Sequence, residues 1–126
     1  MAEILELTHT FRFEAAHLLP RLPDSHKCRR LHGHSFIVDV VLRGPLDPDL
    51  GWLVDFGEVR RLVEPIRDQL DHRYLNEIPG LDNPTSEQIA IWIWARLVPG
   101  IPLLAAVTVR ETCNNSCTYR GPSTDS

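Results

Sequence analysis

Two long stretches of alternating polar and apolar residues constrain the fold of this chain most strongly. From Leu5 to His17 the odd-numbered positions are apolar or histidine, and the even-numbered positions between them are mostly polar. From His32 to Leu42 the even-numbered positions show the same pattern. A period of two is typical of a β-strand with one buried face. The sequence therefore predicts two strands, joined by a loop over residues 18–30 that is long for a compact domain.

Two helices are predicted in the middle of the chain, the first after Asp55 up to Leu70 and the second from Thr85 to near Pro99. Each opens with capping-box spacing, in which a capping side chain is followed three residues later by Glu or Gln. Pro65 lies inside the first helical pattern and should kink it, because proline cannot donate the interior hydrogen bond.

Two further strands are expected over Leu103–Thr112 and Cys117–Arg120, after which residues 121–126 form a frayed tail. The order β-β-α-α-β-β predicts an α+β fold, with a four-stranded antiparallel sheet covered on one face by both helices. A length of 126 residues fits one domain, so residues 1–126 are assigned to a single unit.

Charge and hydropathy limit the partners that the chain is expected to have. The formal charge of −4 offers no basic surface for nucleic acid. No apolar run approaches the roughly 20 residues of a membrane helix, and the polar start does not resemble a signal peptide. We therefore expect a cytoplasmic protein, in which three cysteines do not form a disulfide framework.

Three histidines at strand ends form the strongest candidate site. His32 and His34 are two residues apart, so both imidazoles project from the same side of a strand. His17 ends the other predicted strand on its apolar side and meets the pair if the strands are neighbours. Three neutral imidazoles with an open fourth position form a catalytic zinc site. The alternative is that they are ordinary core histidines with satisfied hydrogen bonds.

Cys28 stands in the loop just before the histidine pair, beside Lys27, Arg29 and Arg30. Neighbouring cations stabilise a thiolate, so this pattern is typical of a reactive cysteine, although an ordinary loop cysteine among solvated charges would show it too.

Two acidic positions complete the candidate set. Asp71 and His72 follow the first helix, where an acid–histidine pair can move protons or where a histidine merely complements the helix dipole. Glu111 continues the apolar side of its strand, where a carboxylate needs a partner such as a ligand with two adjacent N–H donors. The alternative is a strand-end glutamate that reaches solvent. Cys113 and Cys117 flank a turn and are interpreted as structural or incidental.

Together these residues resemble the 6-pyruvoyl-tetrahydropterin synthase family, and within it the bacterial branch that forms 6-carboxytetrahydropterin for queuosine. The resemblance depends on six stretches in order and at family-like spacing, which are Phe13–His17, His26–His34, Gly51–Phe56, Leu70–Asn76, Asn83–Glu87 and Val109–Thr112. Singly these stretches are modest signals, but six together are very specific.

The resemblance implies a T-fold whose subunits join sheet edges into barrels and assemble into a homohexamer with active sites at subunit contacts. It implies that His17, His32 and His34 hold Zn²⁺. Cys28 would be the catalytic cysteine, Asp71 and His72 its proton-relay pair, and Glu111 the pterin anchor. Lys27, Arg29 and Arg30 would hold the triphosphate of the implied substrate, or would simply lower the pKa of the thiol. The implied reaction is conversion of 7,8-dihydroneopterin triphosphate to 6-carboxytetrahydropterin, acetaldehyde and triphosphate.

Two alternative functions remain open on the sequence. A 6-pyruvoyl-tetrahydropterin synthase would eliminate triphosphate but keep every side-chain carbon. A non-catalytic zinc domain would instead close its metal site with a fourth protein ligand, for which Cys28 is the nearest candidate.

Overall fold

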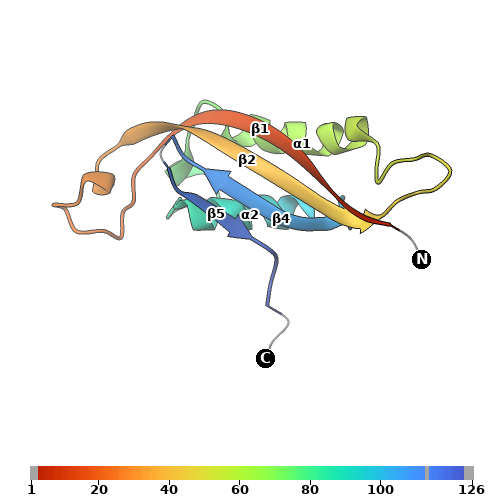
Figure 1. Cartoon of the computed structure of the whole chain (residues 1–126). Helices are drawn as coiled ribbons and strands as arrows, with labels where there is room; N and C mark the ends of the chain where they lie inside the picture. Colours follow the sequence, from red (N-terminus) through yellow and green to blue (C-terminus); the bar gives the residue numbers. More distant parts are fainter. Residues whose placement is uncertain (1–2, 113, 124–126) are drawn as a thin grey trace.

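The computed structural model describes residues 3–112 and 114–123, in which a layer of five strands is covered by two α-helices (Figure 1). The elements in chain order are β1 (Ile4–His17), η1 (Lys27–Arg29), β2 (His32–Pro45), α1 (Phe56–Leu70), β3 (Arg73–Tyr74), η2 (Leu75–Glu77), α2 (Ser86–Leu97), β4 (Leu104–Arg110) and β5 (Ser116–Tyr119). This arrangement confirms the predicted α+β class. Cys113 and residues 124–126 of the predicted tail lie outside the described residues.

The sheet has the strand order β3-β1-β2-β4-β5. Four strands pair antiparallel as predicted, and β3 adds a fifth, two residues long, that runs parallel to β1. The prediction of a four-stranded, wholly antiparallel sheet was wrong in this respect. Two residues are too few to show the alternating pattern by which the other strands are found in sequence.

The register between β1 and β2 decides which residues enter the core. His17 lies opposite His32, and Phe13 lies opposite Phe36, so the odd positions of β1 share a face with the even positions of β2. That face is buried against the helices, as the alternation predicted. Its buried members are Phe11, Phe13, Ala15, His17, Phe36, Val38, Val40 and Leu42.

The helices begin at the predicted caps. The Asp55 carboxylate accepts from the amide of Gly57 at 3.0 Å, and the Thr85 hydroxyl accepts from the amide of Gln88 at 3.1 Å. Glu58 pairs with Arg61. The first capping box is therefore only half formed.

Helix α1 runs through Pro65 without interruption, and Pro65 is exposed. The proline therefore does not end the helix at this point.

The aromatic core directly supports the predicted histidine site. The rings of Phe13 and Phe36 are stacked with centroids 4.8 Å apart. The Phe36 ring in turn meets the rings of His17 and His34 edge to face, each at 5.6 Å. The histidines are thus the polar end of a continuous packed layer, and their orientation depends on that packing.

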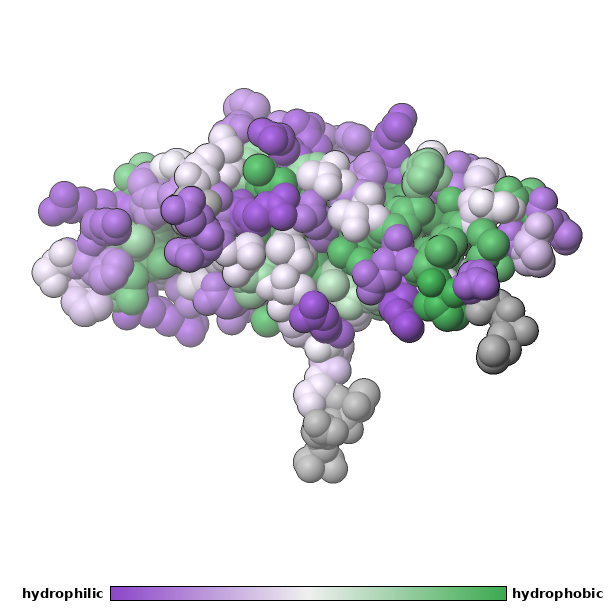
Figure 2. Space-filling view, in the orientation of Figure 1, coloured by the Kyte–Doolittle hydropathy of each residue, from purple (hydrophilic) through white to green (hydrophobic). Residues whose placement is uncertain are grey.

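The face shown in Figure 2 is largely hydrophilic, with hydrophobic side chains gathered toward the end where β1 starts and β2 finishes. The large apolar side chains exposed in this part of the chain are Ile4, Leu5, Leu50, Trp52 and Phe56. Within the described ranges, neither helix is both long and apolar enough to cross a membrane.

We expect the Pro65→Ala substitution to increase the free energy of unfolding by about 1–2 kcal/mol. Alanine restores the missing backbone N–H and removes the ring clash, a gain of about 3 kcal/mol in a helix interior, partly offset by a more flexible unfolded chain. Urea unfolding followed by circular dichroism measures the change. Glu64→Ala, at the preceding exposed position, is the control and should change stability by less than half as much. A destabilised Pro65→Ala variant would contradict the prediction.

Candidate metal centre and the surrounding cavity

Three histidines meet where β1 ends and β2 begins. The cross-strand pair His17 and His32 lie opposite each other, and His34 projects from the same face two residues along β2. One ring nitrogen from each histidine can be chosen so that all three lie within 4.8 Å of one another. The structure thus brings together all three predicted ligands, in an arrangement that can hold a metal ion.

The second ring nitrogen of two histidines is fixed by a backbone carbonyl. The Nδ1 of His17 lies 2.8 Å from the Pro84 carbonyl oxygen, and the Nδ1 of His32 lies 2.6 Å from that of Arg30. A carbonyl oxygen can only accept, so both Nδ1 atoms carry hydrogen and both Nε2 atoms offer a lone pair. This is the second contact that metal-binding histidines make in proteins.

His17 gives the clearest sign that a ligand is expected here. Its side chain is 1% exposed, and its Nε2 is buried without a hydrogen-bond partner among the described residues. Burial is the main cause that lowers the pKa of His17, opposed by the hydrogen bond to Pro84. A neutral imidazole with an unsatisfied buried lone pair is costly unless something binds it. A metal ion fits that position and charge state.

Glu111 lies beside this cluster. One carboxylate oxygen is 3.4 Å from the Nε2 of His34, and the other accepts from the Ser86 hydroxyl at 3.0 Å. Its side chain is 21% exposed. The sequence left open a carboxylate on the buried side of its strand and one that reaches solvent. Glu111 has features of both, because it continues the buried side of β4 and lines a cavity.

A cavity of about 560 Å³ brings together five of the ten predicted site residues. It is lined by Lys27, Cys28, His32, His34, Glu111 and Asn115. A smaller cavity of about 140 Å³ shares Glu111 and Asn115 and adds Ser86, Glu87, Ser116 and Cys117. Sequence reasoning missed Asn115 and Ser86, because a turn asparagine and a helix-start serine carry no periodic signal. Burial is the main cause that raises the pKa of the Cys117 thiol, and the negative charge of Glu87 raises it further.

The three predicted basic residues differ in their surroundings. Lys27 lines the cavity beside Cys28. The Arg29 guanidinium donates to the Leu22 carbonyl at 3.0 Å and lies 3.2 Å from Asp24, so it holds its own loop together. Arg30 is exposed, and its backbone carbonyl accepts a hydrogen bond from the Nδ1 of His32. Among the three, Lys27 is therefore the one that the structure places at the cavity wall.

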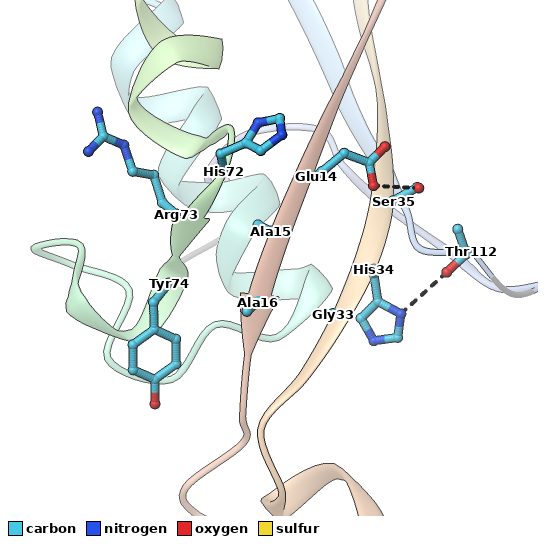
Figure 3. A pocket seen from close by; sticks show the side chains of 10 residues that line it. All are labelled: Glu14, Ala15, Ala16, Gly33, His34, Ser35, His72, Arg73, Tyr74 and Thr112. Carbon is cyan, nitrogen blue, oxygen red and sulfur yellow. Dashed lines mark hydrogen bonds between the residues drawn. The ribbon is translucent and has the colours of Figure 1, made fainter.

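The structure places Asp71 and His72 apart from Cys28. Figure 3 shows His72 and His34 among the residues that line one cavity, with β1 passing between them. His72 lines a second cavity, of about 710 Å³, with Glu14, Ala16, Gly33 and Ser35, which face away from the helices. His34 lines both this cavity and the cavity of Cys28. Cys28 and Glu111 are not among the residues that line it. Within one chain, the acid–histidine pair and the cysteine do not meet.

The Asp71 carboxylate is held by three donors. One oxygen accepts from the Glu14 amide at 2.9 Å, and the other lies 3.0 Å from the His72 Nδ1 and 3.4 Å from the Arg67 guanidinium. The Glu14 amide is the largest cause that lowers the pKa of Asp71. Arg67 also donates to the Arg12 carbonyl at 2.8 Å. Sequence reasoning missed the contact of Arg67 with Asp71, although their i, i+4 spacing on a helix could have suggested it.

His72 takes a backbone conformation that few residues adopt. Its φ is +59°, in the left-handed region, and its amide donates to the Glu14 carbonyl at 2.6 Å. Such a conformation costs a non-glycine residue about 1–2 kcal/mol. The bonds to Asp71 and Glu14 offset that cost and hold an imidazole whose side chain is 78% exposed. The pair is thus well fixed yet open to a partner.

The sequence matches known proteins along almost its whole length. The profile of the 6-pyruvoyl tetrahydropterin synthase family matches residues 6–122. A 6-carboxy-5,6,7,8-tetrahydropterin synthase of Synechocystis is 43% identical over 118 residues, covering 89% of this chain and 90% of the relative. A 6-pyruvoyl tetrahydrobiopterin synthase of Dictyostelium discoideum is 35% identical over 100 residues, covering 75% and 74%. The solved 6-pyruvoyl tetrahydropterin synthase of Caenorhabditis elegans superposes with a TM-score of 0.89 at 30% identity, covering 96% of this chain and 98% of that one.

The lowered pKa of Asp71 predicts a contribution to stability that depends on pH. Because the native pKa lies below the ordinary value of 3.8, this contribution is complete above that value and is lost as the pH falls through the native pKa. We expect the Asp71→Asn variant to lose less stability than the unsubstituted protein between about pH 5 and about pH 2. Urea unfolding across this range measures it.

Asp68→Asn is the matched control for this titration. It removes the same charge from an exposed position three residues earlier on α1. Its stability should therefore follow that of the unsubstituted protein over the acid range. Parallel curves for the Asp71→Asn and unsubstituted proteins would contradict the assigned role of the Asp71 contacts.

Proposed function

The chain belongs to the 6-pyruvoyl tetrahydropterin synthase family, and on that premise we propose that it is a zinc-dependent carbon–carbon lyase. The proposed reaction converts 7,8-dihydroneopterin triphosphate and one water molecule to 6-carboxy-5,6,7,8-tetrahydropterin, acetaldehyde and triphosphate in queuosine (7-deazaguanine) biosynthesis. The observation that carries the proposal is the single cavity in which Cys28, two of the clustered histidines and Glu111 meet. Identity of 43% to the Synechocystis enzyme, against 35% to the Dictyostelium one, favours the carboxy product.

The three imidazoles fit zinc better than other common ions. Neutral nitrogen ligands suit zinc, and three of them leave a fourth position open for substrate. Among the described residues, the group of possible ligands includes only His17, His32 and His34, and Cys28 does not join it. An open site supports catalysis over the alternative of a closed structural zinc site. Bound zinc would supply a Lewis acid that polarises hydroxyl and carbonyl oxygens of the substrate side chain.

Glu111 is suited to anchor the pterin ring. Its two carboxylate oxygens can accept from the adjacent ring N–H and 2-amino groups of a pterin, a bidentate pairing that fixes orientation as well as affinity. The Ser86 hydroxyl bonds one of these oxygens and limits rotation of the carboxylate. The ring would then occupy the smaller cavity, and its side chain would extend toward Cys28 and the histidines.

Cys28 is the proposed base that takes a proton from a side-chain carbon. Its thiol belongs to a partly buried residue in the cavity wall, next to Lys27. A nearby ammonium group stabilises a thiolate and can also bind the triphosphate. Because Arg29 is engaged with Leu22 and Asp24, Lys27 is the favoured phosphate contact of the three basic residues.

The location of Asp71 and His72 supports an active site shared between subunits. His72 lines a cavity that does not include Cys28, so His72 and Asp71 would serve the cysteine of a neighbouring copy and relay its proton. The sheet also ends in unpaired edges at β3 and β5, which favours joining to further copies. A homohexamer with sites at its subunit contacts satisfies both features. The exposed apolar end of the sheet suits a further contact of this kind.

A 6-pyruvoyl-tetrahydropterin synthase is the second candidate function. The observation that favours it is the close superposition on the C. elegans enzyme of that name. Both reactions would use the same proton transfers and the same loss of triphosphate, and they differ in whether a carbon–carbon bond then breaks. The product decides between them.

Metal content should follow the histidines and not the cysteine. We expect about one zinc per chain in the unsubstituted protein and in Cys28→Ala, and less than about a tenth of that in His32→Ala, because two imidazoles bind zinc weakly. Atomic absorption after exhaustive dialysis measures it. His9→Ala, a histidine on β1 outside the cluster, is the control and should keep its metal. Loss of zinc from Cys28→Ala would instead favour a four-ligand structural site.

The products formed from 7,8-dihydroneopterin triphosphate test the reaction itself. Mass spectrometry should find 6-carboxytetrahydropterin and acetaldehyde with the unsubstituted protein. The Cys28→Ala variant should form product at least 10³-fold more slowly, since its proton acceptor is removed. A pyruvoyl product would support the second candidate, and no turnover in any preparation would contradict both.

A further inference from the structure

The cysteine of the cavity stands in a loop with little regular structure to hold it. Residues 18–31 contain one short element, the single turn η1, and Cys28 is its middle residue. In strands and long helices the backbone ladder fixes where a side chain points, but here individual contacts must do so. The contacts made by the Cys28 backbone therefore decide where its thiol lies.

Both backbone groups of Cys28 are bonded, one to the main chain and one to a side chain. Its carbonyl accepts from the Leu19 amide at 2.8 Å, which ties the turn to the segment just after β1. Its amide donates to the Nδ1 of His26 at 3.1 Å. The His26 imidazole therefore caps the start of η1 and is the one side chain described as bonding the Cys28 backbone.

His26 is itself held in place by its backbone. Its amide donates to the Pro23 carbonyl at 2.9 Å, and its carbonyl accepts from the Arg29 amide at 3.0 Å. The residue is exposed, so its ring contributes little to the hydrophobic core. Among the described residues it does not belong to the cluster of possible metal ligands. The side-chain hydrogen bond that the structure describes for His26 is the one to the Cys28 amide.

From this geometry we infer that His26 is a positioning residue for Cys28, acting through Nδ1 as a hydrogen-bond acceptor. Histidine is not among the preferred capping residues, which are Ser, Thr, Asp and Asn. An acceptor at Nδ1 requires the neutral ring with its hydrogen on Nε2. The imidazole keeps the cysteine amide satisfied and the turn closed, so the thiol faces the cavity that it shares with Lys27 and His32. The catalytic consequence of this inference depends on the proposed function, whereas the structural part does not.

Two substitutions separate capping from other uses of an imidazole. His26→Asn keeps an acceptor, because the Asn side-chain oxygen can accept from the amide two residues on, as Asn does at helix starts. His26→Ala removes the acceptor. We expect His26→Ala to lower kcat about tenfold with KM changed less than twofold, and His26→Asn to stay within about threefold of the unsubstituted enzyme.

Arg21→Gln is the matched control within the same loop. Its guanidinium makes an exposed contact with Asp82 at 3.8 Å, of the kind that contributes little. This variant should keep the kcat and KM of the unsubstituted protein. A tenfold loss in Arg21→Gln as well would show that any change in the loop is harmful, and it would overturn the specific assignment to His26.

Hydrogen exchange at the Cys28 amide tests the contact without any activity measurement. Fragment-resolved mass spectrometry should show this amide exchanging about tenfold faster in His26→Ala than in His26→Asn or the unsubstituted protein. If the chain shows no turnover, the exchange rates alone still support or overturn the inference. Equal exchange in all variants would overturn it, as would a His26→Asn enzyme as slow as His26→Ala, because the ring would then act by its own chemistry.

Discussion

The antiparallel pairing of β1 with β2 is the constraint on which the rest of the molecule depends. It places His17 opposite His32 and Phe13 opposite Phe36, so one register sets both the metal centre and the aromatic layer beneath it. A slip of one residue would turn every side chain of a strand to the opposite face. The core and the site therefore cannot vary independently, and the pairing that stabilises the fold also assembles the histidines.

The histidine cluster places a buried polar atom without a hydrogen-bond partner among the described residues inside the packed layer. His17 is almost fully buried, its Nε2 has no hydrogen-bond partner in the described part of the chain, and Phe36 packs against it. A protein seldom keeps such an atom without a partner, because each buried unsatisfied polar group costs about 1–3 kcal/mol. Binding of a metal at this point would turn a local destabilisation into a stabilising contact, which links loading of the site to stability of the sheet.

The two faces of the sheet divide the predicted chemistry. The helix-covered side holds the histidines and opens to the cavity with Cys28 and Glu111, whereas His72 lines a second cavity, and His34 lines both. The side chains of each group are held in place. Backbone carbonyls fix the rings of His17 and His32, and the Glu14 amide, His72 and Arg67 hold the Asp71 carboxylate. This division is the reason we propose an active site shared between copies, because a second copy could bring His72 to Cys28.

The sequence by itself determined the four longer strands, the helix starts and five of the six residues that line the cavity of Cys28. Strand period, capping residues and the His-x-His pair are local patterns, and local backbone geometry translates them directly into side-chain direction. What only the tertiary structure decided were contacts between distant segments. These include the short strand β3, the place of Asn115 in the cavity wall and the separation of His72 from Cys28. No period in the sequence encodes them, because they arise from the path of loops and from which sheet face a chain end reaches.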